Sequence, residues 1–330
     1  MGTISNDGKA LRVLIIGSYK KWRMERSTER ALKRAGHATR LFDDKRSKQL
    51  LGAGLTQRRA LSVARSFKPD FVLLGKCQSL ALETVNEIIS GKPNAMWYHD
   101  PPSFRNIKRP DVAHVANVGR MSQTFFISGF VEEWKKLGLP AKFLPSAADR
   151  ELGPRDIKKE WTSDVAFIGT GYDRSRASFL AKVAKRFELK TWGLGWREWR
   201  KEINWTGRAV YGPEFATVCS SAKIILGINP LIARGATNYT SDRTWMVIQA
   251  GGFYLGEATD GITTLLREAD HCAWYKNLEQ CLDRCAYYLA NPATRERVRR
   301  QGQHFVSEHH TFDQRIHNLL SGEEFHNPLG

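Results

Sequence analysis

Residues 167–176, "FIGTGYDRSR", combine glycines and arginines in a pattern that suits an anion. The loop after the apolar run consists of Gly169, Thr170, Gly171 and Tyr172. Glycines let backbone N–H groups approach a ligand, and the N-terminus of a following helix favours negative charge. Arg174 and Arg176 are candidates to neutralise a diphosphate. A plain tight turn is the alternative, and the segment is not a P-loop because no Gly-Lys-Ser/Thr follows.

A second group of residues could bind a flat ring. The segment "WGLGWREW", residues 192–199, places Trp192, Gly193 and Trp196 close together. Trp192 or Trp196 is a candidate to stack on a nucleobase. Packing of aromatic side chains at the edge of a domain is the competing interpretation.

A third group could move a proton. In "WYHDPP", residues 97–102, His99 and Asp100 follow a strand-like run. His99 is a candidate general base near neutral pH, and Asp100 can orient it or act itself. Asp before two prolines is also a common turn signal. His309 and His310 have no third ligand at metal spacing, so we expect no metal site.

These residues follow strands in an alternating pattern of strands and helices. Residues 12–17 form an apolar run, residues 27–37 a helical pattern, and residues 58–70 and 71–76 repeat the pair. The alternation pauses at the polar residues 146–163, resumes at 164–169, and ends in basic helices over 291–317. We predict an α/β protein with two Rossmann-like, doubly wound parallel-sheet domains and a helical C-terminus. The predicted domains are residues 1–150, residues 151–310, and a tail, 311–330, that can cross back to the first domain.

Ligands of doubly wound sheets bind outside the carboxyl ends of the strands. The positions just after predicted strands are therefore the informative ones. Beyond the residues above, they include Gly17, Gly75, Lys76, Asn229 and Glu257.

The composition limits the partners. The 330 residues carry a formal net charge of +17, and residues 1–60 hold 15 Lys or Arg against 5 Asp or Glu. Such a charge attracts polyanions, namely nucleic acid, anionic lipid or acidic glycan, although a solvated surface with no such partner is the alternative. The sequence has no apolar run long enough to span a membrane and begins without a secretory signal. With five scattered cysteines, read as reduced thiols, this predicts a cytoplasmic protein.

The plan of two α/β halves with a phosphate-type loop in the second resembles the GT-B glycosyltransferases. Over residues 140–316 the chain also resembles the CgeB-like family, first named from spore maturation proteins. The matching segments, in order, are "FLPSAAD", "DVAFIGTGYDRSR", "WGLGW", "SAKIILGINP", "SDRTWMVIQAGGFYLGEATDGI", "LEQCLDRCAYYLANPATRERVRRQG" and "HHTFDQR".

The resemblance implies a transferase that uses a nucleotide sugar, with a UDP-sugar preferred, and that needs no metal. The second half would hold the donor, the first half the acceptor, and the chemistry would lie in a cleft between them. Arg174, Arg176 and Arg243 would meet the diphosphate, and the helix after Arg243 would lie under the donor. The implied donor-binding residues are Gly169, Thr170, Gly171, Tyr172, Arg174, Arg176, Trp192, Gly193, Trp196, Asn229, Ser241, Arg243, Gln249, Gly251, Gly252 and Glu257.

One position departs from the family pattern. An acidic residue that normally binds the ribose stands five residues before the first glycine of the Gly-Gly pair, where this chain has Met246. A thioether accepts hydrogen bonds poorly. Gln249 or Glu257 would then take over the ribose, the donor would differ, or activity would be lost.

Three functions remain open for the acceptor. The basic first half favours DNA with hydroxylated or hydroxymethylated bases, which would be flipped into a pocket and held largely through phosphate contacts. The family resemblance favours a glycan of the cell envelope or spore surface. A degenerate transferase that only binds nucleic acid or glycan is the third.

Overall fold

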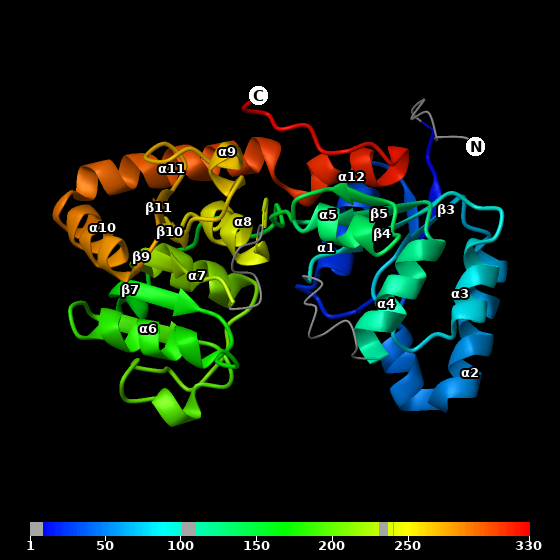
Figure 1. Ribbon diagram of the computed structural model, residues 1–330, viewed down its shortest axis with the longest axis horizontal. Helices are drawn as coiled ribbons and strands as arrows, with labels where there is room; N and C mark the ends of the chain where they lie inside the picture. The colour runs from blue at the N-terminus through cyan, green and yellow to red at the C-terminus, as the bar shows by residue number, and fades with distance from the viewer. Residues whose placement is uncertain (1–8, 101–109, 231–236, 240) are drawn as a thin grey trace. The chain divides into compact units, whose positions relative to one another are not determined.

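A computed structural model of the protein describes residues 9–100, 110–230, 237–239 and 241–330. The first residues of the chain and Pro101 and Pro102 of "WYHDPP" lie outside the described residues. The chain folds into two compact units (Figure 1). Unit 1 comprises Met1–Pro145 and Phe312–His326, and unit 2 comprises Ser146–Thr311 and Asn327–Gly330.

Unit 1 is built on a six-stranded sheet of order β2-β1-β3-β4-β5-β6, and every pair of neighbours is parallel. The central strands are continuous apolar runs because helices cover both faces of such a sheet. Its strands are β1 (Arg12–Ile16), β2 (Ala38–Phe42), β3 (Phe71–Leu74), β4 (Asn94–Tyr98), β5 (Thr124–Ile127) and β6 (Ala141–Phe143).

The helices of unit 1 connect these strands, with one exception. They are α1 (Met24–Arg34), α2 (Asp44–Phe67), α3 (Leu82–Ile89), α4 (Pro110–Met121), α5 (Val131–Lys136) and α12 (Phe312–Ser321). Helix α12 comes from the far end of the chain and packs against α1 and β4 (Figure 1). The C-terminal segment is therefore part of the first unit's core.

Unit 2 has a five-stranded parallel sheet of order β11-β10-β9-β7-β8. The strands are β7 (Ser163–Ile168), β8 (Leu189–Trp192), β9 (Ala222–Gly227), β10 (Tyr254–Glu257) and β11 (Ala273–Tyr275). The helices are α6 (Arg174–Ala184), α7 (Pro213–Ser221), α8 (Asp242–Gln249), α9 (Ile262–Leu265), α10 (Leu278–Ala290) and α11 (Pro292–His309). Short 3₁₀ turns occur at Lys159–Trp161 and Arg197–Trp199.

The predicted fold class, with two parallel-sheet α/β domains, is confirmed. The largest difference from a predicted helix is in α2, predicted over residues 58–70, which begins fourteen residues earlier, at Asp44. Gly52, with φ +79°, interrupts the helix and separates its two parts. The first part of α2 begins with polar residues and contains two glycines, so its sequence lacks the apolar periodicity that predicts a helix.

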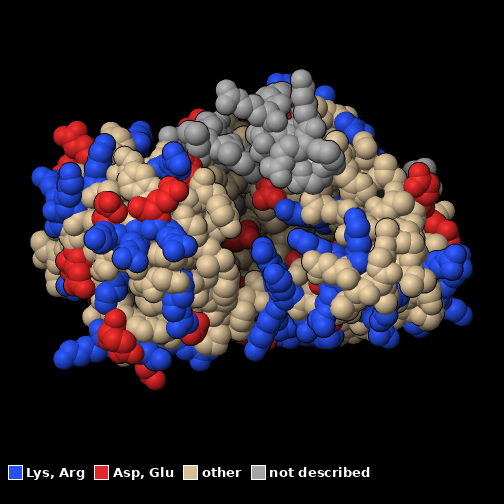
Figure 2. Space-filling view, turned by 90° about the horizontal axis from the view of Figure 1, so that it is seen from below, with Lys and Arg blue, Asp and Glu red and all other residues tan. Residues whose placement is uncertain are grey.

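The surface reflects the composition. Lys and Arg side chains are spread over the visible face of both units and outnumber Asp and Glu there (Figure 2). All five cysteines are buried as free thiols. Among the described residues, no helix is both long and apolar enough to cross a membrane.

Candidate functional site

In each sheet the chain order reverses at one place, and this place is where ligands of doubly wound sheets bind. In unit 2 the reversal lies between β7 and β9, and in unit 1 between β1 and β3. The residues just beyond the carboxyl ends of these strands are therefore the first to examine.

Arg243, near the start of α8, bridges the reversal point of unit 2. Its two terminal nitrogens donate to the carbonyl oxygens of Ile168, at 2.8 Å, and Ile228, at 2.9 Å. Ile168 ends β7, and Ile228 directly follows β9. The guanidinium is therefore held across the ends of both strands, 4.7 Å above the ring of Phe167.

Arg176, in the first turn of α6, shares this location. Its guanidinium carbon lies 6.0 Å from the centre of the same Phe167 ring, and the residue is only 8% exposed. Burial lowers the pKa of Arg176 to about 10, and the charge of Arg243 adds to that effect, while Asp173, Tyr239 and Glu257 partly offset it. Both arginines thus lie near the same ring, with Arg176 buried and Arg243 half-buried.

One guanidinium nitrogen of each arginine has no hydrogen-bond partner in the described part of the chain. The Nε atoms of Arg176 and Arg243 are buried and have no hydrogen-bond partner among the described residues. Within the same residues, no hydrogen bond reaches any nitrogen of the Arg176 guanidinium. A buried cation without its anion is costly, and guanidinium groups match phosphate oxygens in geometry. The pair can therefore bind a dianion such as a diphosphate.

The glycine loop supports this pair through its packing. The N–H groups of Gly169 and Gly171 donate to the carbonyl oxygens of Trp192 and Leu194, at 2.9 Å and 2.8 Å. A Cβ atom on Gly169 would lie 2.6 Å from an Arg243 terminal nitrogen, so only glycine leaves room for that guanidinium. These two amides, predicted to meet an anion, are already paired within the protein.

The N-terminus of α6 is also occupied. Asp173 is its N-cap, and its carboxylate accepts from the Ser175 N–H at 2.9 Å. The anion-binding role predicted for this helix end therefore rests on Arg176 and not on the Ser175 amide.

The remaining residues of this loop face solvent. Arg174 has a side chain that is 83% exposed and lies 3.7 Å from the carboxylate of Glu198. Thr170 is exposed, and Tyr172 is 80% exposed. The structure thus brings Arg176 together with Arg243 and leaves Arg174 apart from them.

The two tryptophans predicted to stack on a base are buried. Trp196 has no exposed surface, and its indole N–H donates to the Gly169 carbonyl oxygen at 2.8 Å. Trp192 packs on Trp161 with ring centroids 5.1 Å apart. Gly193 lies between them with φ +136°, and a Cβ there would lie 1.9 Å from the Gly169 oxygen. These residues hold the loop in place, and the exposed ring beside it is that of Tyr172.

Asn229 and Glu257 meet at the ends of β9 and β10. The Asn229 N–H donates to a Glu257 carboxylate oxygen at 2.9 Å, and its side-chain amide lies 3.3 Å from the Glu257 carbonyl oxygen. Glu257 also contributes to the electrostatic environment of Arg176. It therefore lies on the same side of unit 2 as the two arginines.

Helix α8 divides the other predicted donor residues between two edges of the sheet. Ser241 is its N-cap and lies beside Arg243, at the carboxyl edge. Gln249 ends the helix, is buried, and accepts from the Ser307 hydroxyl at 2.9 Å. Because α8 leads to the start of β10, Gln249 lies at the opposite edge, remote from the arginine pair. Met246 is half-buried, one turn before the end of α8.

Gly251 and Gly252 lie at this opposite edge too. Gly251 has φ +73°, and a Cβ there would lie 2.8 Å from Pro154. A Cβ on Gly252 would lie 2.9 Å from Val247. Backbone packing therefore accounts for both glycines.

In unit 1, His99 and Asp100 follow β4. The Nδ1 atom of His99 contacts the Ser128 hydroxyl at the end of β5, and its Nε2 atom contacts the Met24 sulfur. Asp100 pairs with Lys76 at 2.5 Å. Partial burial would raise the pKa of Asp100, but the charge of Lys76 and hydrogen bonds from Lys76 and Tyr98 outweigh it and lower the pKa.

Glu25 is a further acid at the reversal point of unit 1. A Cβ on Gly17, after β1, would lie 2.4 Å from its Cγ, and one on Gly75, after β3, would lie 3.4 Å from its Oε1. Burial raises the pKa of Glu25, while backbone hydrogen bonds and the charges of Arg23 and Lys76 oppose that rise. The helical pattern of residues 27–37 begins two residues after Glu25, whereas α1 begins at Met24 and includes it. The available signal was an acid soon after the first strand.

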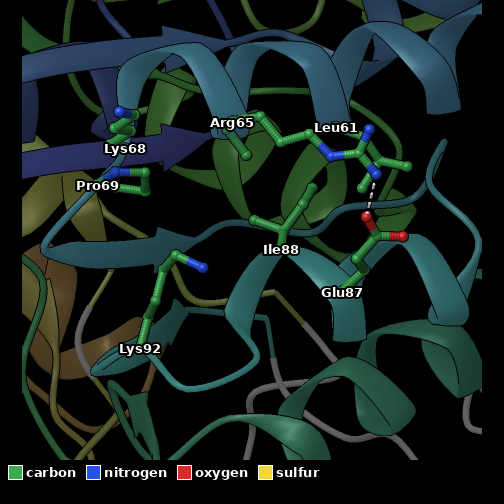
Figure 3. Close-up of a pocket in the computed structure, with 8 residues that line it drawn as sticks. Leu61, Arg65, Lys68, Pro69, Glu87, Ile88 and Lys92 are labelled. Atoms are coloured by element: carbon green, nitrogen blue, oxygen red, sulfur yellow. Dashed lines mark hydrogen bonds and ion pairs between the residues drawn. The ribbon is translucent and has the colours of Figure 1, made fainter.

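The amino edge of the sheet of unit 1 has a shallow cavity between α2 and α3 (Figure 3). Its volume is about 270 Å³, and its lining includes Leu61, Ile88 and the ion pair between Arg65 and Glu87, whose atoms are 2.7 Å apart. This edge is opposite the strand ends discussed above, so the cavity is separate from the candidate site. Among the described residues, no group of three His, Cys, Asp or Glu is placed to hold a metal ion.

Residues 174–321, less than half of the chain, match a family model described as "Glycosyl transferase-like". No curated protein matches the sequence.

Solved structures resemble the chain over nearly its whole length. One is Anabaena HepE in complex with UDP and glucose, with TM-score 0.64 and 10% identity, over 95% of this chain and 100% of that one. Another is sucrose-phosphate synthase from Thermosynechococcus elongatus, with TM-score 0.65 and 11% identity, over 92% and 95%. A third is an alpha-glucosyltransferase in complex with UDP-glucose and DNA containing an abasic site, with TM-score 0.61 and 12% identity, over 92% and 96%. The chain has the GT-B fold of these proteins, and the finer resemblance to the CgeB-like family stays a prediction.

Proposed function

We propose that the protein is a glycosyltransferase that takes a hexosyl or pentosyl group from a nucleoside diphosphate sugar, with a UDP-sugar preferred. One observation carries the proposal. Arg176, which is buried, and Arg243, which is half-buried, both lie near the ring of Phe167 at the reversal point of the second sheet. A diphosphate would place negative charge against two guanidinium groups, which form strong charge-assisted hydrogen bonds with phosphate oxygens.

In the proposed reaction an acceptor hydroxyl oxygen bonds to the anomeric carbon of the sugar. The bond between that carbon and the β-phosphate oxygen breaks, and the nucleoside diphosphate leaves. Arg176 and Arg243 stabilise the charge that develops on the leaving group. The hydroxyl proton passes to a base on unit 1, for which His99, Asp100 and Glu25 are the candidates. The proposed reaction uses no metal ion.

The remaining donor residues are assigned by their side of the sheet. Ser241, Asn229 and Glu257 belong to the carboxyl edge, and Glu257 is the candidate for the ribose in place of the acid that Met246 replaces. Tyr172 is the candidate for a contact with the base.

DNA that carries hydroxylated or hydroxymethylated bases is the first candidate acceptor. The net charge of +17 favours a polyanion. The fold is also that of a DNA-bound glucosyltransferase. A glycan of the cell envelope or spore surface is the second candidate, and three exposed leucines of unit 1, Leu50, Leu51 and Leu55, favour it. The third candidate, a transferase that has lost activity and only binds, follows from Met246.

A thermal-shift series with nucleoside diphosphates and their sugars tests the proposal. We expect UDP or a UDP-sugar to raise the melting temperature of the wild-type chain, because a ligand of the native state stabilises it. The Arg243→Gln variant should lose most of that shift. If no nucleotide shifts the wild-type chain while duplex DNA still binds, the inactive binding protein is the better account.

A further inference from the structure

The first part of α2 ends in an exposed apolar segment. Every residue of "KQLLGAGL", positions 48–55, is exposed. Leu50 is 71% exposed, Leu51 37% and Leu55 52%. A single exposed leucine is ordinary, but three exposed leucines within six residues are a feature that calls for a partner.

Hydrogen bonds hold this segment in a defined shape. The Thr56 hydroxyl donates to the Gly52 carbonyl oxygen at 2.7 Å, which closes the kink. The Gln57 amide donates to the Ser79 carbonyl oxygen at 3.0 Å and accepts from the Ala81 N–H at 3.0 Å. Ser79 follows β3, so the segment projects from the carboxyl edge of the sheet, the edge that also carries Glu25.

Every charged residue from 45 to 59 is positive, and Asp43 and Asp44 directly precede this segment. We call residues 45–59 the leucine tip, and its cations are Lys45, Arg46, Lys48, Arg58 and Arg59. The tip has no Asp or Glu, and all five cations are exposed. None of them forms an ion pair with another residue that the structure describes.

We propose that the leucine tip docks the protein on an anionic membrane surface. Leucine side chains enter the acyl region, while lysine and arginine remain among the anionic head groups. A second copy of the chain is a poor partner, because two such tips repel each other. Duplex DNA would neutralise the cations, but it offers the leucines no apolar layer.

This proposal goes beyond the transferase and does not depend on it. Where the proposed function holds as well, docking would bring the carboxyl edge of the sheet of unit 1, which carries His99 and Glu25, to the membrane. The envelope glycan is then the acceptor class that the tip supports.

Co-sedimentation of the full chain with lipid vesicles tests the proposal. We expect binding to vesicles that mix phosphatidylcholine with phosphatidylglycerol, and much weaker binding to phosphatidylcholine alone. The combined Leu50→Ser, Leu51→Ser and Leu55→Ser variant should partition at least about tenfold more weakly. Ile157→Ser, which alters an exposed apolar residue of unit 2, should bind like the wild type.

A second pair of variants tests whether vesicle binding requires the positive charges of the leucine tip. Arg58→Gln with Arg59→Gln should weaken vesicle binding about tenfold, because each cation near an anionic surface contributes to binding. Lys185→Gln with Arg186→Gln removes two adjacent exposed cations from unit 2 and should have little effect.

Three results would overturn the proposal. They are a wild-type chain that stays in solution with anionic vesicles, a leucine variant that binds as well as the wild type, and a chain that binds duplex DNA but no vesicle. None of these measurements uses a nucleoside diphosphate. Failure of every nucleotide in the thermal-shift series would therefore refute the transferase and leave the vesicle result standing.

Discussion

Two arginines in α6 show which features of the site residue types alone can predict. The sequence places Arg174 and Arg176 in one motif and predicts both to face a diphosphate. Residues two apart in a helix point about 200° from each other, so the two side chains cannot share a face. The structure buries Arg176 beside Arg243 and leaves Arg174 in solvent.

These two positions give a matched pair of variants. Arg176→Gln should weaken UDP binding about tenfold to a hundredfold, because it removes charge-assisted hydrogen bonds to phosphate. Arg174→Gln removes the same charge from an exposed site and should change the affinity little. Isothermal titration of UDP into both variants measures the difference. Equal losses in the two variants would speak against the buried pair as the phosphate site.

Glu25 predicts a pH dependence of stability. Its pKa is raised from the ordinary 4.5, so the native state binds its proton more tightly than the unfolded state does. The stability that this proton contributes is present below pH 4.5 and is lost as the pH rises through the raised pKa. Glu25→Gln should therefore gain stability relative to the wild type at neutral pH, and less so below pH 4.5.

Urea unfolding of the two proteins at both pH values tests this. A stability difference that does not change with pH would mean that Glu25 ionises in the folded protein as it does in water.

At the level of elements, two loops of unit 2 hold the arginine pair. The loop after β7 and the loop after β8 touch at Gly169, Gly171 and Gly193. The sequence identified both segments, because glycines after apolar runs are visible in one dimension. The sequence could not show that the two loops pack on each other. The Gly169 and Gly171 amides, predicted to bind phosphate, are hydrogen-bonded to Trp192 and Leu194 instead.

Gly193→Ala tests this packing. The change places a Cβ 1.9 Å from the Gly169 oxygen at φ +136°, and we expect it to cost about 2–4 kcal/mol of unfolding free energy. UDP binding should weaken with it, because the loop would move. Gly207→Ala is the control, since its φ is also positive, at +82°, but no atom lies within 4 Å of the new Cβ; it should cost about 1 kcal/mol.

Helix α2 shows where prediction from apolar periodicity fails. Its second part was predicted over 58–70 because alanines, leucines and valines recur there at helical spacing. Its first part exposes its leucines and contains two glycines, so neither amphipathicity nor propensity marks it. The exposed leucines that remove the helical periodicity from this part also make it a candidate docking surface.

For the whole molecule, the alternation of strands and helices was enough to predict two parallel sheets, and hence the fold class. Strand order, the reversal points and the path of the C-terminus depend on long-range contacts that local patterns do not encode. Helix α12 illustrates this, because it follows unit 2 in the sequence but packs in unit 1. Within it, Arg315 is buried and donates to the Pro145 carbonyl oxygen at 3.1 Å.

The first residue of α12 tests that arrangement. Phe312 meets Trp97 edge-on with ring centroids 5.7 Å apart, and Trp97 in turn lies 5.0 Å from the ring of His99. Phe312→Ala should destabilise the protein by about 3–5 kcal/mol in chemical unfolding. His317→Ala, on an exposed position of the same helix, should leave stability close to that of the wild type. A small effect of Phe312→Ala would mean that α12 is only loosely attached.

Titration of the wild-type chain with UDP and with uridine tests the central claim most directly, because the two ligands differ only in the diphosphate. If Arg176 and Arg243 hold the diphosphate, UDP binds and uridine binds at least about a hundredfold more weakly. Equal affinity for the two ligands, or no binding of UDP at all, would contradict the account.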